Sequence, residues 1–244
     1  MAAKHLDIKQ RKDRILAIVV GQYIKTITPV GSHTITEEFN LDVSPATVRN
    51  ILAELEEQGY LTHPHTSAGR IPTQRGYRYY VDHLMNEIEL LEGEKKRIQA
   101  ECKQYVNQLE NLMDKASSMI SDITSYTTII SVDGWGSKII LKGTSNVVGY
   151  HEQTDILKIQ AILRILEEKE RILALINRDL QHKIDIYIGH EMALKEIEGC
   201  SLAVSSFEKD GLTGRIAVSG PTRMNYDRVV SALEYMSDLL SHKK

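Results

Sequence analysis

The sequence SPATVRNILAELEEQGYLTHPHTSAGRIPTQRGYRYY, residues 44–80, is the most informative about the structure of the amino-terminal part of the chain. Ser44 is a preferred residue type for the cap that starts a helix, and Pro45 suits the first helical position. Gly59 can adopt the left-handed backbone conformation that ends a helix. Between these two ends, four apolar residues recur at helical spacing and predict one buried stripe: Val48, Ile51, Leu52 and Leu55.

The other face of this predicted helix is small and polar, and it carries no acid before Glu54. Asn can pair with adenine and Arg with guanine in the DNA major groove, and small residues allow a helix to approach the bases closely. We therefore expect the first turns of the helix to read DNA through Ser44, Ala46, Thr47, Arg49 and Asn50. For Arg49 and Asn50, surface salt bridging or capping is the alternative.

The segment after this helix contains no Asp or Glu from Gln58 to Val81. Pro64 and Gly69 favour turns, so the segment predicts a β-ribbon, the wing of a winged helix-turn-helix. Its candidate contacts to phosphates and minor groove are His65, Thr66, Ser67, Arg70 and Arg75. The tyrosines around Arg75 and Arg78 leave open a second role, in which these arginines anchor the ribbon to the next helix.

Two further helices are expected before the reading helix. The first covers residues 7–26 and is predicted to bury Ile15, Ile18, Val19 and Tyr23. The second covers residues 32–39. Three helices and a ribbon complete the predicted winged helix-turn-helix.

The sequence PVGSHTITEEFNLDVSPATVRNILAELEEQGYLTHPHTSAGRIPTQRGYRYYVDHL, residues 29–84, resembles the amino-terminal domain of the heat-inducible transcription repressor HrcA family. IYIGHE (186–191), CSLAVSSF (200–207) and GRIAVSGPTRMNYDRVVSALEYMSDLLS (214–241) resemble the carboxy-terminal signature of the same family. The resemblance implies a GAF-like regulatory domain, repression of chaperone operons, and a GroEL-type chaperonin that keeps the repressor folded and active. Only the second half of that GAF-like domain is expected here, starting near residues 138–150, without its first half and its inserted subdomain.

Between the two matched ends, apolar residues alternate in steps of four and three, which is a heptad pattern. The seam consists of Leu84, Ile88, Leu91, Ile98, Cys102, Tyr105, Leu109, Leu112, Ala116, Met119 and Ile123. One interpretation is a single helix on the order of 60 Å long that forms a dimeric coiled coil. The other is two shorter helices that pack on their own domain.

The carboxy-terminal part predicts an α+β domain with a largely antiparallel sheet. Its predicted strands are TTIISV, KIILK, KIDIYI, SLAVSS and GRIAVS. One long helical pattern covers residues 155–177, and a closing helix covers residues 226–240. EKDGLTG, residues 208–214, is expected to form a hairpin connection.

Composition and scattered motifs exclude several classes of protein. No apolar run approaches the roughly 20 residues that span a bilayer, and the start of the chain lacks a secretory core, so we expect a cytoplasmic protein without membrane contact. Cys102 and Cys200 are expected to be buried thiols. No zinc spacing, phosphate loop or nucleophile elbow occurs, so no enzyme, metal or cofactor is expected. Arg223, just before the closing helix, is a candidate anion ligand, with capping or a dimer contact as its alternative roles.

The sequence thus predicts three parts: a winged-helix DNA-binding domain (1–82), a linker or dimerisation helix (83–125), and a shortened GAF-like regulatory domain (126–244). We expect a homodimeric transcription repressor that binds an inverted repeat in double-stranded DNA. The alternative is a regulator that acts mainly by sensing a ligand or partner through its GAF-like domain.

Overall fold

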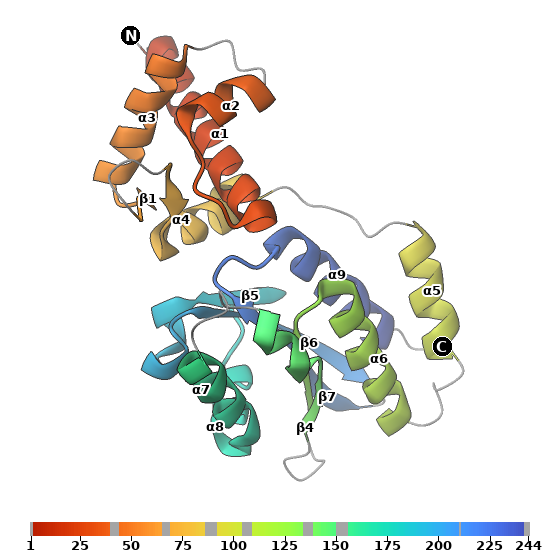
Figure 1. Ribbon diagram of the computed structural model, residues 1–244. Helices are drawn as coiled ribbons and strands as arrows, with labels where there is room; N and C mark the ends of the chain where they lie inside the picture. Colours follow the sequence, from red (N-terminus) through yellow and green to blue (C-terminus); the bar gives the residue numbers. More distant parts are fainter. Residues whose placement is uncertain are drawn as a thin grey trace. The chain divides into compact units, whose positions relative to one another are not determined.

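The computed structural model describes residues 2–39, 44–64, 69–85, 92–103, 109–133, 139–149, 156–209 and 211–241 (Figure 1). The chain divides into two compact units, residues 1–86 and residues 87–244. Each unit has its own buried apolar residues, and each is described by itself below.

The first unit consists of helices followed by a short antiparallel ribbon. Its elements are α1 (Ala2–Thr26), α2 (Ser32–Glu38), α3 (Pro45–Glu57), β1 (Leu61–Thr62), β2 (Ile71–Pro72), α4 (Gln74–Tyr79) and a π-helical turn η1 (Tyr80–Leu84). In the ribbon, Leu61 pairs with Pro72 and Thr62 with Ile71. The two predicted helices that precede α3 are confirmed as α1 and α2.

The core of the first unit lies between α1, α2 and α3. The predicted stripe of α3 is confirmed, because Val48, Ile51, Leu52 and Leu55 are its buried residues. On α1 the buried residues are Ile15, Leu16, Val19 and Val20. Ile18 and Tyr23 are only half-buried, so the stripe predicted for α1 is partly wrong. Leu16 and Val20 lie beside Ile15 and Val19, so the buried side of α1 is broader than the predicted stripe.

The second unit is built on one five-stranded sheet. Its helices are α5 (Glu92–Lys103), α6 (Leu109–Thr124), α7 (Ile156–Glu167), α8 (Lys169–Ile176) and α9 (Tyr226–Ser241). Its strands are β3 (Thr127–Val132), β4 (Ile139–Lys142), β5 (Ile184–Ile188), β6 (Cys200–Lys209) and β7 (Leu212–Pro221). Short 3₁₀ turns lie at η2 (Thr144–Gly149), η3 (Gly189–Met192) and η4 (Lys195–Ile197). The strand order is β4-β3-β7-β6-β5, and each neighbouring pair is antiparallel, which confirms the predicted α+β class.

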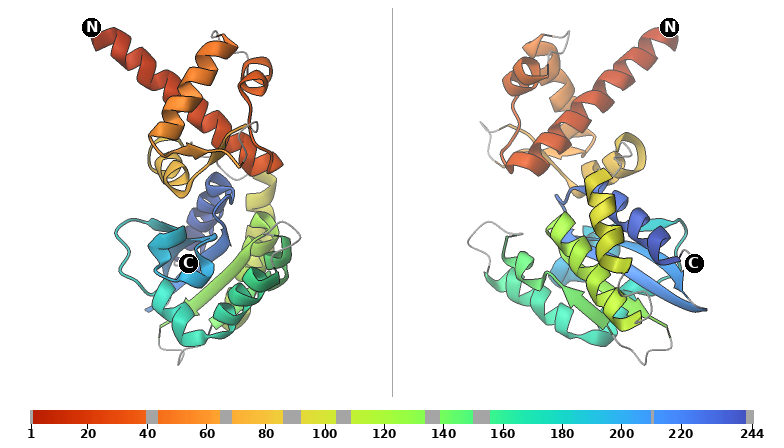
Figure 2. Two further views of the ribbon diagram at one scale, coloured as in Figure 1. Left: turned by 60° about the vertical axis from the view of Figure 1, so that its left-hand side comes forward. Right: turned by 90° about the vertical axis from the view of Figure 1, so that its right-hand side faces the viewer.

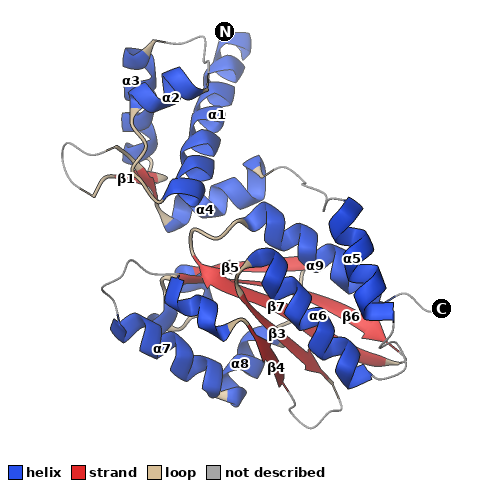
Figure 3. Ribbon diagram, turned by 45° about the vertical axis from the view of Figure 1, so that its right-hand side comes forward, coloured by secondary structure: helices blue, strands red, loops and turns tan. Residues whose placement is uncertain are grey.

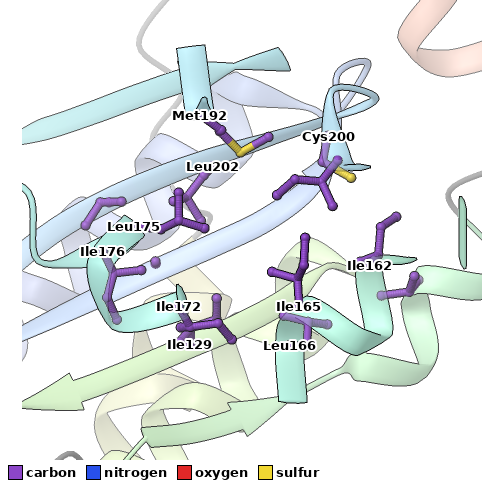
Figure 4. Packing of buried hydrophobic residues seen from close by; sticks show 14 residues of the cluster. Ile129, Ile162, Ile165, Leu166, Ile172, Leu175, Ile176, Met192, Cys200 and Leu202 are labelled. Atoms are coloured by element: carbon purple, nitrogen blue, oxygen red, sulfur yellow. The ribbon is translucent and has the colours of Figure 1, made fainter. Parts of the chain in front are cut away.

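Helices cover both faces of this sheet (Figures 2 and 3). α6 and α9 lie on one face, where α6 packs on β3 and α9 on β6. α7 and α8 cover the other face, and their apolar residues form a cluster with sheet residues such as Ile129, Leu202 and Ala217 (Figure 4). Successive strand residues point to opposite faces of the sheet. Because helices cover both faces, all six residues of β3 are buried.

The single long helix expected over 83–125 is wrong. Met85 has the extended conformation (φ −63°, ψ 130°), and the described residues beyond it form two helices, α5 and α6, which pack against each other (Figure 2). Glu101 forms an ion pair with Lys115. In a continuous helix these residues would lie about 21 Å apart, so the chain folds back. The alternative with two shorter helices is the one that the structure adopts.

The helix pattern at residues 155–177 also divides in two. Glu168 has a non-helical conformation (φ −82°, ψ 84°), and it separates α7 from α8. The hairpin at EKDGLTG is confirmed by the pairing of Lys209 with Leu212, and Gly211 supplies the positive φ of 79° that this tight connection uses.

Candidate nucleic-acid interface

The start of α3 is capped as its sequence predicts. Ser44 has an extended backbone, and its Oγ accepts a hydrogen bond from the backbone N–H of Thr47 at 3.2 Å. The two hydroxyls of Ser44 and Thr47 are 3.0 Å apart and also hydrogen-bonded. Pro45 occupies the first turn, where its missing N–H costs no helical hydrogen bond. The helix therefore begins at a fixed residue with its first turn exposed.

The predicted reading residues of α3 lie together on its exposed side. Ser44, Ala46, Arg49 and Asn50 are exposed, and Thr47 is half-buried on the flank. No acidic residue occurs in the first turn of the helix. The structure therefore presents a small, polar and partly basic surface, which is what a base-reading helix needs. That these side chains contact DNA stays a prediction.

The end of α3 is a Schellman motif. Gly59 has φ +75°, its N–H donates to the Glu56 carbonyl at 2.8 Å, and the Tyr60 N–H donates to the Leu55 carbonyl at 2.9 Å. Thr73 then joins α4 to this turn. Its N–H and its hydroxyl both donate to the Tyr60 carbonyl, and its hydroxyl also accepts from Gly76 N–H at 3.1 Å. The helix end, the ribbon and α4 are thus held as one piece.

The ribbon follows directly from this turn. The predictions for His65, Thr66 and Ser67 fall outside the described residues. Arg70 lies just before β2, and its backbone N–H and carbonyl bond to the carbonyl and N–H of Val30, each at 2.9 Å. A side chain at Gly69 would meet the Val30 carbonyl carbon at 2.5 Å, so this close approach requires glycine.

Three arginines of this segment make contacts within the protein. Arg70 Nη2 donates to Glu56 Oε2 at 2.8 Å, and the Arg70 side chain is 23% exposed. Arg75 is exposed, and its guanidinium lies 4.9 Å from the centroid of the Tyr60 ring, a cation–π contact. Arg78 pairs with Asp82 at 3.0 Å. The Arg75–Tyr60 contact joins α4 to the residue just before the ribbon, which supports the anchoring role left open for Arg75, whereas Arg78 pairs within the α4–η1 segment.

The sequence did not predict the contacts of Glu56 with His63 and Arg70, nor the Tyr79–Asp13 pair. His63 Nδ1 bonds to Glu56 Oε1, so one carboxylate of α3 contacts both sides of the ribbon. The Tyr79 hydroxyl donates to Asp13 Oδ1 at 2.9 Å, which ties α4 to α1. Burial first, and then the bond to Asp13, raise the pKa of Tyr79 to about 12. No local sequence signal marks these contacts, because each joins residues that only the fold brings together.

Arg223 belongs to the second unit, in the turn between β7 and α9. Its positive charge acts on the Tyr126 hydroxyl, which accepts a hydrogen bond from the Asn225 N–H at 3.1 Å. Burial nevertheless raises the pKa of Tyr126, because it outweighs this charge and that bond. A role for Arg223 in binding an anion stays a prediction.

Metal sites, membrane spans and buried thiols can be assessed for the part of the chain that the structure describes. Within it, no group of three or more His, Cys, Asp or Glu residues has the arrangement of a metal site. No helix within it has the length and apolar character needed to span a membrane. Cys200 is buried, as predicted, and burial raises the pKa of its thiol to about 12. The side chain of Cys102 lies outside the described residues.

Comparison with known proteins gives consistent matches. The HrcA protein C terminal domain family matches residues 91–230, so the match begins one residue before α5, earlier than the start near residue 138 expected from the sequence. The Heat-inducible transcription repressor HrcA of Carboxydothermus hydrogenoformans is 30% identical and aligned over 96% of this chain and 97% of its own. The Heat-inducible transcription repressor HrcA of Clostridioides difficile is 27% identical and aligned over 98% of this chain and 100% of its own. A crystal structure of a hypothetical protein has the same fold, with a TM-score of 0.73 at 19% identity over 95% of this chain and 97% of its own.

The chain is shorter than its relatives within the aligned region. The alignment with the Carboxydothermus hydrogenoformans protein has 333 positions against 244 residues here, so at least 89 positions of that relative have no counterpart. The family match nevertheless covers more than half of the chain, and the similarity to the relatives extends over nearly all of it. The chain belongs to the HrcA family.

Proposed function

We propose that this protein is a heat-inducible transcription repressor whose first unit is a winged helix-turn-helix that binds double-stranded DNA. Its α3 is the reading helix, and the β1–β2 ribbon is the wing. The observation that carries this proposal is the exposed, acid-free start of α3 with Arg49 and Asn50 on it, between a capped beginning and a Schellman end. The two relatives named above are heat-inducible transcription repressors, which supports the same conclusion.

The proposed operator is an inverted repeat in front of chaperone operons, bound by a homodimer. Two copies of α3 related by a two-fold axis would read half-sites about one helical turn of DNA, roughly 34–36 Å, apart. Selection of bound fragments from random duplex DNA tests this directly, because it reports both the sequence and the spacing of half-sites. An inverted repeat that also occurs in a chaperone promoter is expected, and a gel shift with that promoter checks it. Binding without any sequence preference would contradict the proposal.

The alternative, a regulator that acts mainly through a small ligand in the second unit, has less support. The space enclosed between α7, α8 and the sheet measures about 20 Å³, and its lining includes Ile129, Ile172 and Leu202. That is room for about one water molecule, whereas ligand pockets measure roughly 300–1,000 Å³. This site is a packed core rather than a ligand pocket. An increase of the melting temperature with a small ligand, in a protein that binds no DNA, would favour the ligand-sensing alternative over the repressor.

The family resemblance also implies a GroEL-type chaperonin as the partner of this repressor. We include that partner in the proposal as the source of heat regulation. Denatured protein should regain operator binding to a greater extent with the chaperonin and ATP than without them. Equal recovery in both samples would remove the chaperonin from the proposal.

A further inference from the structure

Glu56 occupies an unusual place for an acid, because it lies in the last turn of the proposed reading helix and faces the wing. Its side chain is 24% exposed, and each carboxylate oxygen has its own partner. Oε1 bonds to His63 Nδ1, and Oε2 accepts from Arg70 Nη2 at 2.8 Å. One side chain of α3 thus contacts residues at the ends of both ribbon strands.

The register of the ribbon explains how one carboxylate can contact both strands. Leu61 pairs with Pro72 and Thr62 with Ile71, so one further step places His63 opposite Arg70. Side chains directly opposite each other in an antiparallel pair lie on the same face. His63 and Arg70 therefore face α3 together, and Glu56 lies between them.

Arg70 is fixed more firmly than a phosphate-binding arginine requires. Its backbone forms two hydrogen bonds of 2.9 Å with Val30, and its guanidinium is held by Glu56. A DNA phosphate would have to compete with that carboxylate for the same guanidinium. Arg70 alone therefore joins the α1–α2 connection, the ribbon and α3.

We infer that Glu56 is a positioning residue: it sets the angle at which the wing leaves the reading helix, and Arg70 acts on DNA binding through Glu56 rather than by holding a phosphate. The inference rests on the proposed DNA-binding function. It makes a counter-intuitive prediction. An acid near DNA repels phosphates, so its removal should strengthen binding by charge alone. If Glu56 positions the wing, its removal weakens binding instead.

The test compares Glu56→Ala and Glu56→Gln with Glu57→Ala in the full chain. Glu57 is the next residue of α3 and is exposed, so Glu57→Ala removes the same charge without the contact to the ribbon. Binding to the selected operator and to random duplex is measured at several salt concentrations. Glu57→Ala should bind as the parent protein does or more tightly. Glu56→Ala should lose about tenfold or more on the operator, and Glu56→Gln less, because its amide oxygen can still accept from Arg70.

Arg70→Ala completes the set. If Arg70 acts through Glu56, Arg70→Ala should lose as much operator affinity as Glu56→Ala. The double variant should bind no more weakly than either single variant. The slope of the affinity against salt concentration should stay that of the parent protein. Loss of a phosphate contact would instead reduce that slope by about 0.9. Such a reduction, or a Glu56→Ala variant that binds like Glu57→Ala, would overturn the inference.

A measurement without DNA separates this inference from the proposed function. Amide hydrogen exchange at Arg70 and Val30 reports the bonds that hold the ribbon base. Glu56→Ala should speed exchange at both amides, and Glu57→Ala should not. Equal exchange in the two variants refutes the positioning role even if the protein binds its operator. A parent protein that selects no operator refutes the proposed function, whatever the exchange shows.

Discussion

Arg228 of α9 donates from Nη2 to Glu94 Oε1 of α5 at 2.7 Å, while its Nε donates to the Ile123 carbonyl at the end of α6 at 2.8 Å. One guanidinium therefore joins three helices of the second unit. The Tyr235 hydroxyl adds a bond of 3.2 Å to the Lys95 carbonyl. In α5, whose sequence is strongly polar, Ile98 is fully buried, and these polar contacts join the helix to α6 and α9 as well.

Replacement of Arg228 by Ala should loosen α5 from α6 and α9. We expect the free energy of unfolding of the second unit to fall by about 1–2 kcal/mol, because a charge-assisted bond and a bond to a helix-end carbonyl are lost together. Amide exchange in residues 92–103 should become faster. The control is Lys183→Ala. It breaks an exposed ion pair of 3.0 Å between Lys183, just before β5, and Asp238 of α9, and it should change the free energy of unfolding by less than about 1 kcal/mol. Equal effects of the two variants would show that Arg228 does not hold α5.

Asn50→Ala separates base reading from attraction to phosphate. Asn can form two hydrogen bonds with adenine, so its loss should cost roughly 1–3 kcal/mol on the operator and little on random DNA. Titrations with both duplexes at several salt concentrations measure the difference. An equal loss on both would exclude Asn50 as a base reader.

Leu112 is 3% exposed, which changes what its substitution can report. In a dimeric coiled coil, Leu112→Asp would separate two chains, but in this structure it would place a charge in the core of the second unit. We expect Leu112→Ala to lower the free energy of unfolding by about 2–5 kcal/mol. Leu157→Ala is the matched control, because Leu157 is 77% exposed and its loss should have an effect within about 0.5 kcal/mol. Denaturant unfolding measures both, and a small effect at Leu112 would contradict its burial.

The Cys200 thiol should be unreactive while the protein is folded. Its pKa of about 12 leaves little thiolate at neutral pH, so a Cys102→Ser variant, with Cys200 as its single thiol, should react with a thiol reagent only after unfolding. Because the folded pKa is raised, this group stabilises the fold below the unfolded value of 9.0, and that contribution is lost as the pH rises toward 12. Rapid labelling of the native protein at neutral pH would contradict this burial.

The sequence predicted most accurately where structure is determined locally. Ser44, Pro45 and Gly59 set the two ends of α3 through their own backbone preferences, and all three act as expected. The five strands of the second unit were also predicted, because short apolar runs between turn residues are typical of buried strands. The hairpin at residues 208–214 predicted the antiparallel pairing of β6 with β7, but the order of the five strands was not predicted.

The sequence predicted least where an apolar stripe has more than one possible partner. The apolar seam through Leu112 and Met119 is compatible with a coiled coil, and it is equally compatible with packing against α5, α9 and β3. Periodicity gives the buried face of a helix but not what covers it. The Glu56 contacts could not be predicted either, because they depend on the register of a ribbon with only two residues in each strand.

The bridge between Val30 and Arg70 has a consequence for how such proteins can diversify. Val30 and Thr73 fix the base of the ribbon from outside it, so the pairing of Leu61 with Pro72 does not depend on the length of the connection between Pro64 and Gly69. Insertions or exchanges between those two positions should leave the strand register unchanged. The sequence between Pro64 and Gly69 can therefore vary, in nature or by design, while the strands that present it keep their pairing.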